Sequence, residues 1–297
     1  SWPQRVSVGL SPVGLSPSYE GRTREVVTDP STLLQLEPLD DFEGQPFLHQ
    51  FSPSASLSDY MDVISRYMRG LVSAAGVSVV VAGRTEEKLV QTVETIASRG
   101  GEAIAVACNV KNSEDLQHLV SVCVKHFGGL NILVNNAQEV PNGLLDDVTD
   151  KAFTAGFESG PLATLRLMKL AHPHLLGDGC IINLASTAAK RWDMSGYGAY
   201  AAVKESIRSL TRAAACEWGP EGIRSNAILP HAKSPGLAGW MEQNPTEAEA
   251  FQASIPQRRV GECEEDIGRF VVQLCSEGSS YINGQTIAVD GGQAYLG

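Results

Sequence analysis

Positive charge and long apolar runs are both scarce in this sequence. Among 297 residues, 23 Lys and Arg stand against 34 Asp and Glu, so the formal net charge is −11. Proteins bind nucleic-acid backbones through clustered Lys and Arg, and this balance therefore disfavours a nucleic-acid partner. No stretch reaches the roughly 20 apolar residues that a membrane-spanning helix needs. With 43% hydrophobic residues, the chain has enough apolar surface for one large soluble domain, or at most two.

Closely spaced metal ligands are missing as well. The six cysteines form no CxxC pair, and the six histidines form no HExxH pair. Zinc sites depend on such spacings, so we expect no bound metal. Scattered cysteines in a chain of this length are typical of small buried side chains in a reducing compartment. That compartment is either the cytoplasm or an organelle matrix.

Residues 1–57 differ in composition from the rest of the chain. Seven of the 15 prolines precede Ala55, and the motif VGLSP occurs twice in tandem, at Val8–Pro12 and Val13–Pro17. Two interpretations stay open for this stretch, a flexible tail or an arm whose apolar side chains lie across a neighbouring surface. We therefore predict an irregular Pro-rich extension over residues 1–57 and a folded domain over residues 58–297.

Short β-branched runs alternate with amphipathic stretches in the folded domain. The first run, 77–82, is rich in valine, as a buried parallel strand requires, and helical spacing of apolar residues follows over 85–99. The pattern continues with strands at 102–107, 131–135, 180–184, 223–229 and 286–289, and with helices at 113–127, 154–174, 200–218 and 264–275. This alternation predicts an α/β fold with a doubly wound parallel sheet.

Three polar residues have a spacing that indicates carbonyl chemistry. Ser186 ends the strand that begins at 180, while Tyr200 and Lys204 form a Y-x-x-x-K pair on the following helix. Helical positions four apart share a face, so the lysine ammonium can lower the pKa of the phenol, which is about 10 when unperturbed. A serine at the carboxyl end of a strand can hold a carbonyl oxygen beside that phenol. The predicted catalytic residues are therefore Ser186, Tyr200 and Lys204.

Several motifs from Val77 to Gly292 resemble the short-chain dehydrogenase/reductase family, in particular its 3-oxoacyl-carrier-protein reductase-like branch. They are VVVAGRTEEKL, ILVNNA, INLAS, YGAYAAVK, GIRSNAILP and INGQTIAVDGG. The resemblance implies a Rossmann-like domain in which Tyr200 donates a proton to a carbonyl and Ser186 orients the substrate. It implies that Lys204 assists the tyrosine and binds the cofactor ribose.

The resemblance also implies which residues bind a dinucleotide cofactor. Arg84 stands where family members that favour NADPH place a base for the 2′-phosphate. Asn109 stands where the family's Asp holds the adenine edge, and Asn135 and Ala137 belong to the family's N-N-A-G segment, which faces the cofactor. The implied cofactor, if the chain binds one, is NADP(H).

The glycine-rich T-G-x-x-x-G-x-G loop of the family is absent from this chain. Its three glycine positions fall on Asp59, Val63 and Ser65. Glycine lets the backbone turn sharply and approach the cofactor diphosphate, and these residues add bulk and negative charge instead. One carboxylate about 5 Å from a phosphate charge costs about 3 kcal/mol at an effective dielectric of about 20. We therefore expect a weakened dinucleotide site.

Three further departures from the family's pattern concern residues that would line the same dinucleotide cofactor. Gln138 replaces the glycine of N-N-A-G, and His231 replaces the glycine of the P-G pair after the sixth family strand. In the helix that normally supplies an asparagine to the proton relay, Ser159 or Gly160 stands at that position. Together these changes indicate that selection for ordinary dinucleotide binding has been relaxed or redirected.

Three functions stay open on the sequence. The first is an NADP(H)-dependent carbonyl or alcohol oxidoreductase of weak activity, acting on a small carbonyl or hydroxy compound. The second is a catalytically silent subunit that docks through its N-terminal arm. The third is a non-redox enzyme of lyase or dehalogenase type. The family pairs the helices at 154–174 and 200–218 between subunits, so the resemblance implies a homo- or hetero-oligomer.

Overall fold

The computed structural model describes residues 78–190 and 196–294. The extension 1–57 and the three replaced glycine positions, Asp59, Val63 and Ser65, lie outside the described residues. Within the described range, every predicted strand and helix has a counterpart.

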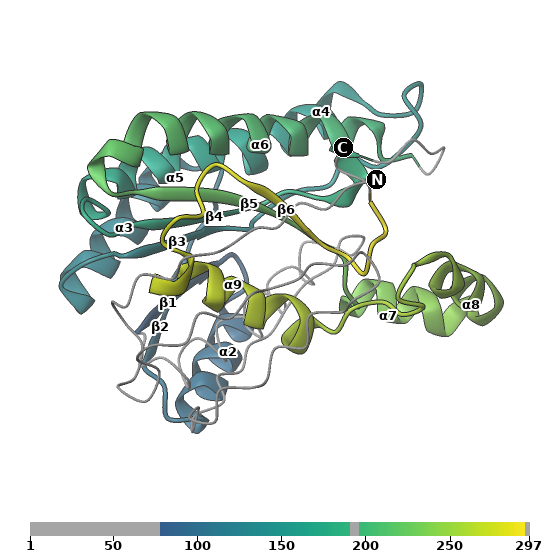
Figure 1. Ribbon diagram of the computed structural model, residues 1–297, viewed down its shortest axis with the longest axis horizontal. Helices are drawn as coiled ribbons and strands as arrows, with labels where there is room; N and C mark the ends of the chain where they lie inside the picture. The colour runs from purple at the N-terminus through teal and green to yellow at the C-terminus, as the bar shows by residue number, and fades with distance from the viewer. Residues whose placement is uncertain (1–77, 191–195, 295–297) are drawn as a thin grey trace, which may run out of the picture. The chain divides into compact units, whose positions relative to one another are not determined.

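Among residues 78–190 and 196–294, all strand pairs are parallel and fall in two sheets (Figure 1). The first sheet pairs β1 (Val79–Gly83) with β2 (Ala103–Ala107). The second has the order β3-β4-β5-β6. Its strands are β3 (Ile132–Asn135), β4 (Cys180–Leu184), β5 (Arg224–Pro230) and β6 (Thr286–Val289). The order of strands and helices along the chain confirms the predicted α/β fold.

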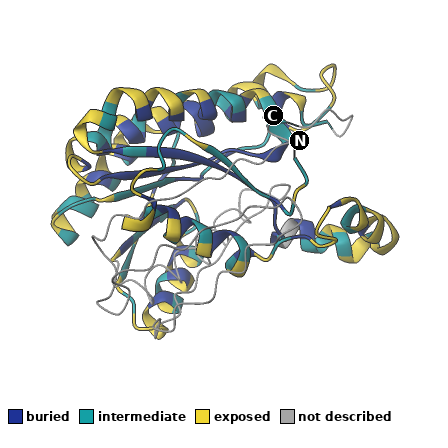
Figure 2. Ribbon diagram, in the orientation of Figure 1, coloured by how far each residue is buried: buried dark blue, intermediate teal, exposed yellow. Residues whose placement is uncertain are grey.

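Helices cover both faces of the second sheet (Figures 1 and 2). On β4, where all five residues are buried, Ile181 packs with α5 and α6, whereas Ile182 faces the opposite side and packs with α9. The helices are α2 (Glu86–Ser98), α3 (Ser113–Phe127), α4 (Asp150–Phe157), α5 (Ala163–Ala171), α6 (Gly198–Trp218), α7 (Pro235–Gln243), α8 (Pro245–Ser254) and α9 (Arg269–Cys275). The run of apolar residues in the central strands therefore reflects burial on both sides.

Local signals in the sequence fix the ends of α3. The Asn112 side chain accepts a hydrogen bond from the backbone N–H of Glu114, and Glu114 and Asp115 lie in the first turn. Gly128 ends the helix with φ of 80°, a conformation that glycine adopts without steric cost. The predicted range 113–127 therefore agrees with the observed helix.

The stretch predicted as one helix at 154–174 is helical throughout, but it is not a single α-helix. The chain instead forms α4, a π-helical turn η2 (Glu158–Leu162), α5 and a short 3₁₀ turn η3 (His172–His174). Pro161 lies inside η2, and its ring has no N–H to continue the α-helical hydrogen bonds. The helix predicted at 264–275 likewise begins as a π-helical segment, η6 (Cys263–Gly268), before α9.

Candidate active site

The carboxyl ends of β4 and β5 and the start of α6 surround the predicted catalytic residues. Ser186 follows β4 directly and caps the 3₁₀ turn η4 (Thr187–Ala189), where its Oγ accepts a hydrogen bond from the Ala188 N–H at 3.2 Å. The serine is 1% exposed. Since its oxygen accepts this bond, the hydroxyl hydrogen remains available to donate to a ligand oxygen.

Tyr200 and Lys204 lie one turn apart on α6, and both are buried. The Lys204 ammonium donates a hydrogen bond to the Leu184 carbonyl at 2.6 Å, which ties α6 to the end of β4. Its nitrogen lies 5.6 Å from the centre of the Tyr200 ring. The structure therefore brings Ser186, Tyr200 and Lys204 to one edge of the sheet, as the spacing predicted.

Burial changes the acid–base behaviour of Lys204. The side chain is 2% exposed, and this burial lowers its pKa from 10.5 to about 7. An ammonium in a low-dielectric site loses hydration, which disfavours its charged form. Lys204 is therefore balanced near neutral pH between a cation and a neutral amine, as functional-site lysines often are.

A buried polar network lies behind these residues, and the sequence did not reveal it. The Asn135 amide donates to Asn183 Oδ1 at 2.8 Å, and the Asn183 amide donates to Thr211 Oγ1 at 2.9 Å. The network links β3, β4 and α6 across the sheet. The Asn135 amide nitrogen is engaged in this network, whereas its Oδ1 has no hydrogen-bond partner among the described residues. The cofactor contact expected of Asn135 stays a prediction.

Charged residues gather where β1, β2 and β3 end. Glu139 forms ion pairs with Arg84 at 3.5 Å and with Lys111 at 3.0 Å. The Asn109 side chain accepts from the Lys111 N–H at 3.2 Å, so it shapes the turn before α3. Ala137 follows β3 and is half-buried. Sequence reasoning missed Lys111, because no local pattern marks a lone lysine as the ion-pair partner of Glu139.

Gln138 and Gly160, which both depart from the family's pattern, are complementary in size. A Cβ atom on Gly160 would lie only 2.3 Å from Gln138 Oε1, so the glutamine side chain fills the space above this glycine. The Gln138 amide also donates to the Gly156 carbonyl at 2.9 Å. Ser159, the alternative relay position, accepts from the Glu139 N–H at 2.8 Å and donates to the Ala155 carbonyl at 2.7 Å. Ser159 and Gly160 therefore both have a role in the packing of η2, Ser159 through its hydrogen bonds and Gly160 by leaving space for Gln138.

Replacing Gly160 by Ala should lower the free energy of unfolding by about 1–3 kcal/mol, because the new methyl group overpacks the Gln138 side chain. In a Gln138→Ala background the same change should cost less than about 0.5 kcal/mol, since the obstructing amide is gone. Urea unfolding of the four proteins measures this difference. Gly239→Ala on α7 is the control, because a Cβ there meets no atom within 4 Å. Equal costs in both backgrounds would contradict the pairing.

Aromatic side chains lie after β5, in the segment 231–257. His231 is buried, and its ring meets Phe251 edge to face with centres 5.4 Å apart. Trp240 on α7 contacts Phe251 on α8 with centres 6.1 Å apart. The segment 233–257 therefore contains the two helices α7 and α8, and Phe251 on α8 contacts both Trp240 and His231.

Comparison with known proteins identifies the family. A family model described as "Enoyl-(Acyl carrier protein) reductase" matches residues 64–294. The chain belongs to the short-chain dehydrogenase/reductase (SDR) family. It is 35% identical over 224 residues to a 12alpha-hydroxysteroid dehydrogenase of a Clostridium species, which covers 73% of this chain and 86% of that protein. It is 31% identical over 220 residues to human Dehydrogenase/reductase SDR family member 4, covering 73% of this chain and 78% of that protein.

Solved structures of SDR proteins share this fold. A single-residue variant of actinorhodin polyketide ketoreductase with NADPH superposes with a TM-score of 0.72 at 25% identity, covering 78% of this chain and 92% of that chain. A putative short-chain alcohol dehydrogenase from Sinorhizobium meliloti 1021 gives a TM-score of 0.69 at 30% identity, covering 80% and 92%. In the part of the SDR chain that the structure describes, no helix combines the length and the apolarity needed to span a membrane.

Proposed function

We propose that this SDR protein is an oxidoreductase that interconverts a small carbonyl compound and its alcohol with NADP(H). The observation that carries this proposal is a buried set of polar residues at the carboxyl end of β4. The Lys204 ammonium is bonded there to the Leu184 carbonyl and lies beside the Tyr200 ring, and Ser186 follows the same strand.

The described residues fit a nicotinamide dinucleotide at both of its ends. Arg84 and Lys111 supply cations at the carboxyl ends of β1 and β2, the side suited to a ribose 2′-phosphate. Lys204 and Tyr200 supply hydrogen-bonding groups at the other end. The diphosphate turn, with Asp59, Val63 and Ser65, lies outside the described residues. The cofactor when bound supplies or accepts the hydride.

The chain's own residues would hold the carbonyl and move the proton. The Ser186 hydroxyl, whose oxygen accepts the Ala188 N–H, donates a hydrogen bond to the substrate carbonyl oxygen and orients it. The Tyr200 phenol gives its proton to the same oxygen as negative charge develops there. The Lys204 ammonium stabilises the phenolate that remains, because the site around it is buried and the attraction is weakly screened.

Arg84→Ala should raise the dissociation constant of NADPH about 10-fold and leave that of NADH almost unchanged, because a charge-assisted bond to the 2′-phosphate is lost. Glu139→Gln should act in the opposite direction, since it removes a carboxylate that competes for Arg84 and Lys111. Calorimetric titration of both cofactors measures these changes. Lys125→Ala, which removes one exposed positive charge from the end of α3, is the matched control. No NADPH binding to the unmodified chain at millimolar cofactor would overturn the proposal.

A silent subunit is the second candidate, and an exposed apolar surface favours it. Phe153 on α4, Leu162 on η2 and Leu165 on α5 are each more than a third exposed. Exposed apolar side chains grouped along consecutive helices are typical of an interface with another subunit. An active oxidoreductase can use the same surface to form an oligomer, so the cofactor titration decides between the two candidates.

A further inference from the structure

Two of the six cysteines lie against each other where β4 begins. The sulfur atoms of Cys180 and Cys275 are 3.7 Å apart, so the two thiols are in contact. Cys180 is the first residue of β4 and Cys275 is the last residue of α9, and they are 95 residues apart in the chain. The structure describes all six cysteines, and all of them are free thiols. The fold therefore brings two reactive groups together that the sequence keeps far apart.

Packing between α9 and the second sheet holds this pair in place. Cys180 is 2% exposed and belongs to the apolar cluster that β4 forms with α9, and the half-buried Cys275 packs against the same cluster. A disulfide bond is about 2.05 Å long, so the two sulfurs need to approach by less than about 2 Å. Cys275 ends its helix, where the backbone is least restrained, and Ser276 after it is exposed. A small oxidant therefore has a short path to the pair.

The charges around the pair favour loss of one thiol proton. The hydrogen bond with Cys275 and the positive charge of Arg224 lower the pKa of the Cys180 thiol, against the opposing effects of burial and of Asp178. Arg224 lies opposite Cys180 on β5, and its guanidinium is fixed there because it donates to the Leu274 carbonyl at 3.0 Å. The thiolate is the form of cysteine that oxidants attack.

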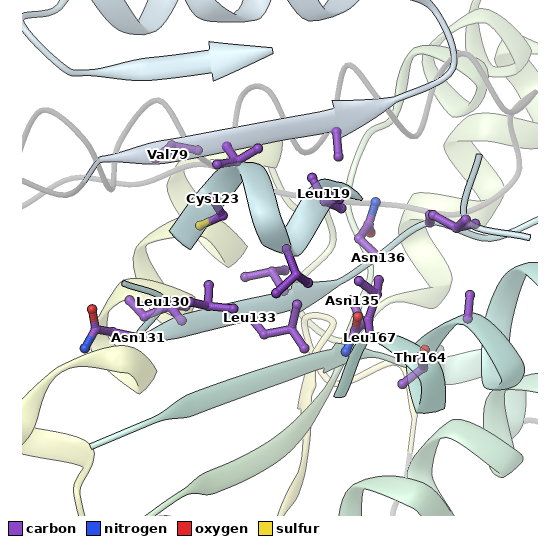
Figure 3. Close-up of a pocket in the computed structure, with 18 of the residues that line it drawn as sticks. Val79, Leu119, Cys123, Leu130, Asn131, Leu133, Asn135, Asn136, Thr164 and Leu167 are labelled. Atoms are coloured by element: carbon purple, nitrogen blue, oxygen red, sulfur yellow. The ribbon is translucent and has the colours of Figure 1, made fainter. Parts of the chain in front are cut away.

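Cys123 is a thiol of similar exposure in a different setting. It is half-buried and lines a cavity of about 490 Å³ beside β1 and β3 (Figure 3). Its sulfur donates to the Gly129 carbonyl at 3.7 Å, and burial raises the pKa of the Cys123 thiol. Cys123 is therefore bonded to an oxygen rather than to a second sulfur, which makes it an internal reference for the pair.

We propose that Cys180 and Cys275 are a site of reversible oxidation, at which hydrogen peroxide converts the two thiols into a disulfide. The Cys180 sulfur attacks one peroxide oxygen and the O–O bond breaks, which gives a sulfenic acid and, with the thiol proton, one water. The Cys275 sulfur then attacks the Cys180 sulfur and the S–O bond breaks, so that hydroxide leaves with the Cys275 proton as a second water. Two electrons pass from the thiols to the peroxide, and a thiol reductant reverses the change.

The place of the pair determines what the disulfide changes. Ser186 lies about 20 Å from Cys180 along the strand direction, so the link forms at the end of β4 that is remote from the predicted catalytic residues. The link closes a loop over residues 180–275, which contains α6, α7 and α8. A link across a longer loop removes more conformational entropy from the unfolded chain. Oxidation should therefore stabilise the fold.

Peptide mapping of the full chain tests for the disulfide. Trypsin cleaves after Lys and Arg and leaves each cysteine in a different peptide, with Cys180 in residues 170–190 and Cys275 in residues 270–297. After treatment with hydrogen peroxide and alkylation of the remaining thiols, mass spectrometry should find these two peptides linked. The linked pair should be at least about 10-fold more abundant than any pair that contains the Cys123 peptide. Its absence after the exposed Cys216 has reacted would overturn the proposal.

Thermal unfolding of the same samples tests the effect of the link. Peroxide should raise the unfolding midpoint by about 5–10 °C, and dithiothreitol should reverse the rise. Cys275→Ser should abolish both the linked peptides and the rise, whereas Cys123→Ser, the matched control, should keep both. An equal rise in the Cys275 variant would overturn the proposal. If that variant does not fold, the peptide map of the unmodified chain still decides the question.

Discussion

Replacing Tyr200 by Phe should reduce kcat for carbonyl reduction by about 10²–10⁴-fold while the circular dichroism spectrum and the unfolding midpoint stay nearly unchanged. The variant removes one hydroxyl from a buried ring on α6 and keeps the shape of the side chain. The loss should appear in kcat rather than in the affinity for NADPH, because the phenol donates its proton only as the carbonyl oxygen becomes negative. Stopped-flow measurement of NADPH oxidation with a panel of small ketones measures the effect.

The control for this variant is Tyr281→Phe, because Tyr281 is fully exposed. It should leave the rate within about twofold of the unmodified protein. A Tyr200→Phe protein that retains full reductase activity contradicts the assigned role of Tyr200. Turnover of a substrate in the absence of nicotinamide, lost in the same variant, would instead favour the non-redox alternative.

Replacing Lys204 by Met should reduce kcat by at least about 100-fold and remove a pH dependence of stability. Burial lowers the pKa of Lys204 to about 7 in the folded chain, from an ordinary value of 10.5. Between these two values the unfolded chain binds a proton that the folded chain does not bind, so the unfolding free energy of the unmodified protein rises with pH over that window. Below about pH 7 both states bind the proton, and the contribution no longer changes.

The measurement is the urea midpoint at intervals from about pH 6 to about pH 10.5, which spans the window between the two pKa values. The Met variant should be the more stable protein at neutral pH, because the cost of burying the ammonium is gone, and it should lack the slope due to Lys204. Lys169→Met on α5 is the control, since that lysine is exposed. A slope that persists unchanged in the Lys204 variant contradicts the assigned burial effect.

Sequence patterns were sufficient for the parallel sheet and for the placement of Tyr200 and Lys204 one turn apart on α6, because both follow from local periodicity. Valine runs predict buried parallel strands, and the four-residue spacing of Tyr200 and Lys204 places them on one helix face. The family comparisons confirm the SDR assignment and the fold. The catalytic roles and the NADP(H) preference remain predictions, because they depend on a ligand and on a turn outside the described residues.

Other features of the site depend on contacts between elements far apart in sequence. Nothing near Gly160 in the chain signals that Gln138 fills the space above it, and nothing near Arg84 signals its pairing with Glu139. The π-helical turn η2 was missed because apolar spacing alone does not distinguish α-helical from π-helical hydrogen bonding. Gln138 and Gly160 depart from the family's pattern as a pair, because the glutamine side chain fills the space above the glycine.

The hydrogen bond between the Lys204 ammonium and the Leu184 carbonyl has a consequence beyond packing. It fixes the position of α6 along β4, so Tyr200, one turn earlier on the same helix, is held in register with the strand end that Ser186 follows. A sliding movement of α6 along the sheet would therefore displace the two hydroxyls relative to each other, even though neither residue had changed.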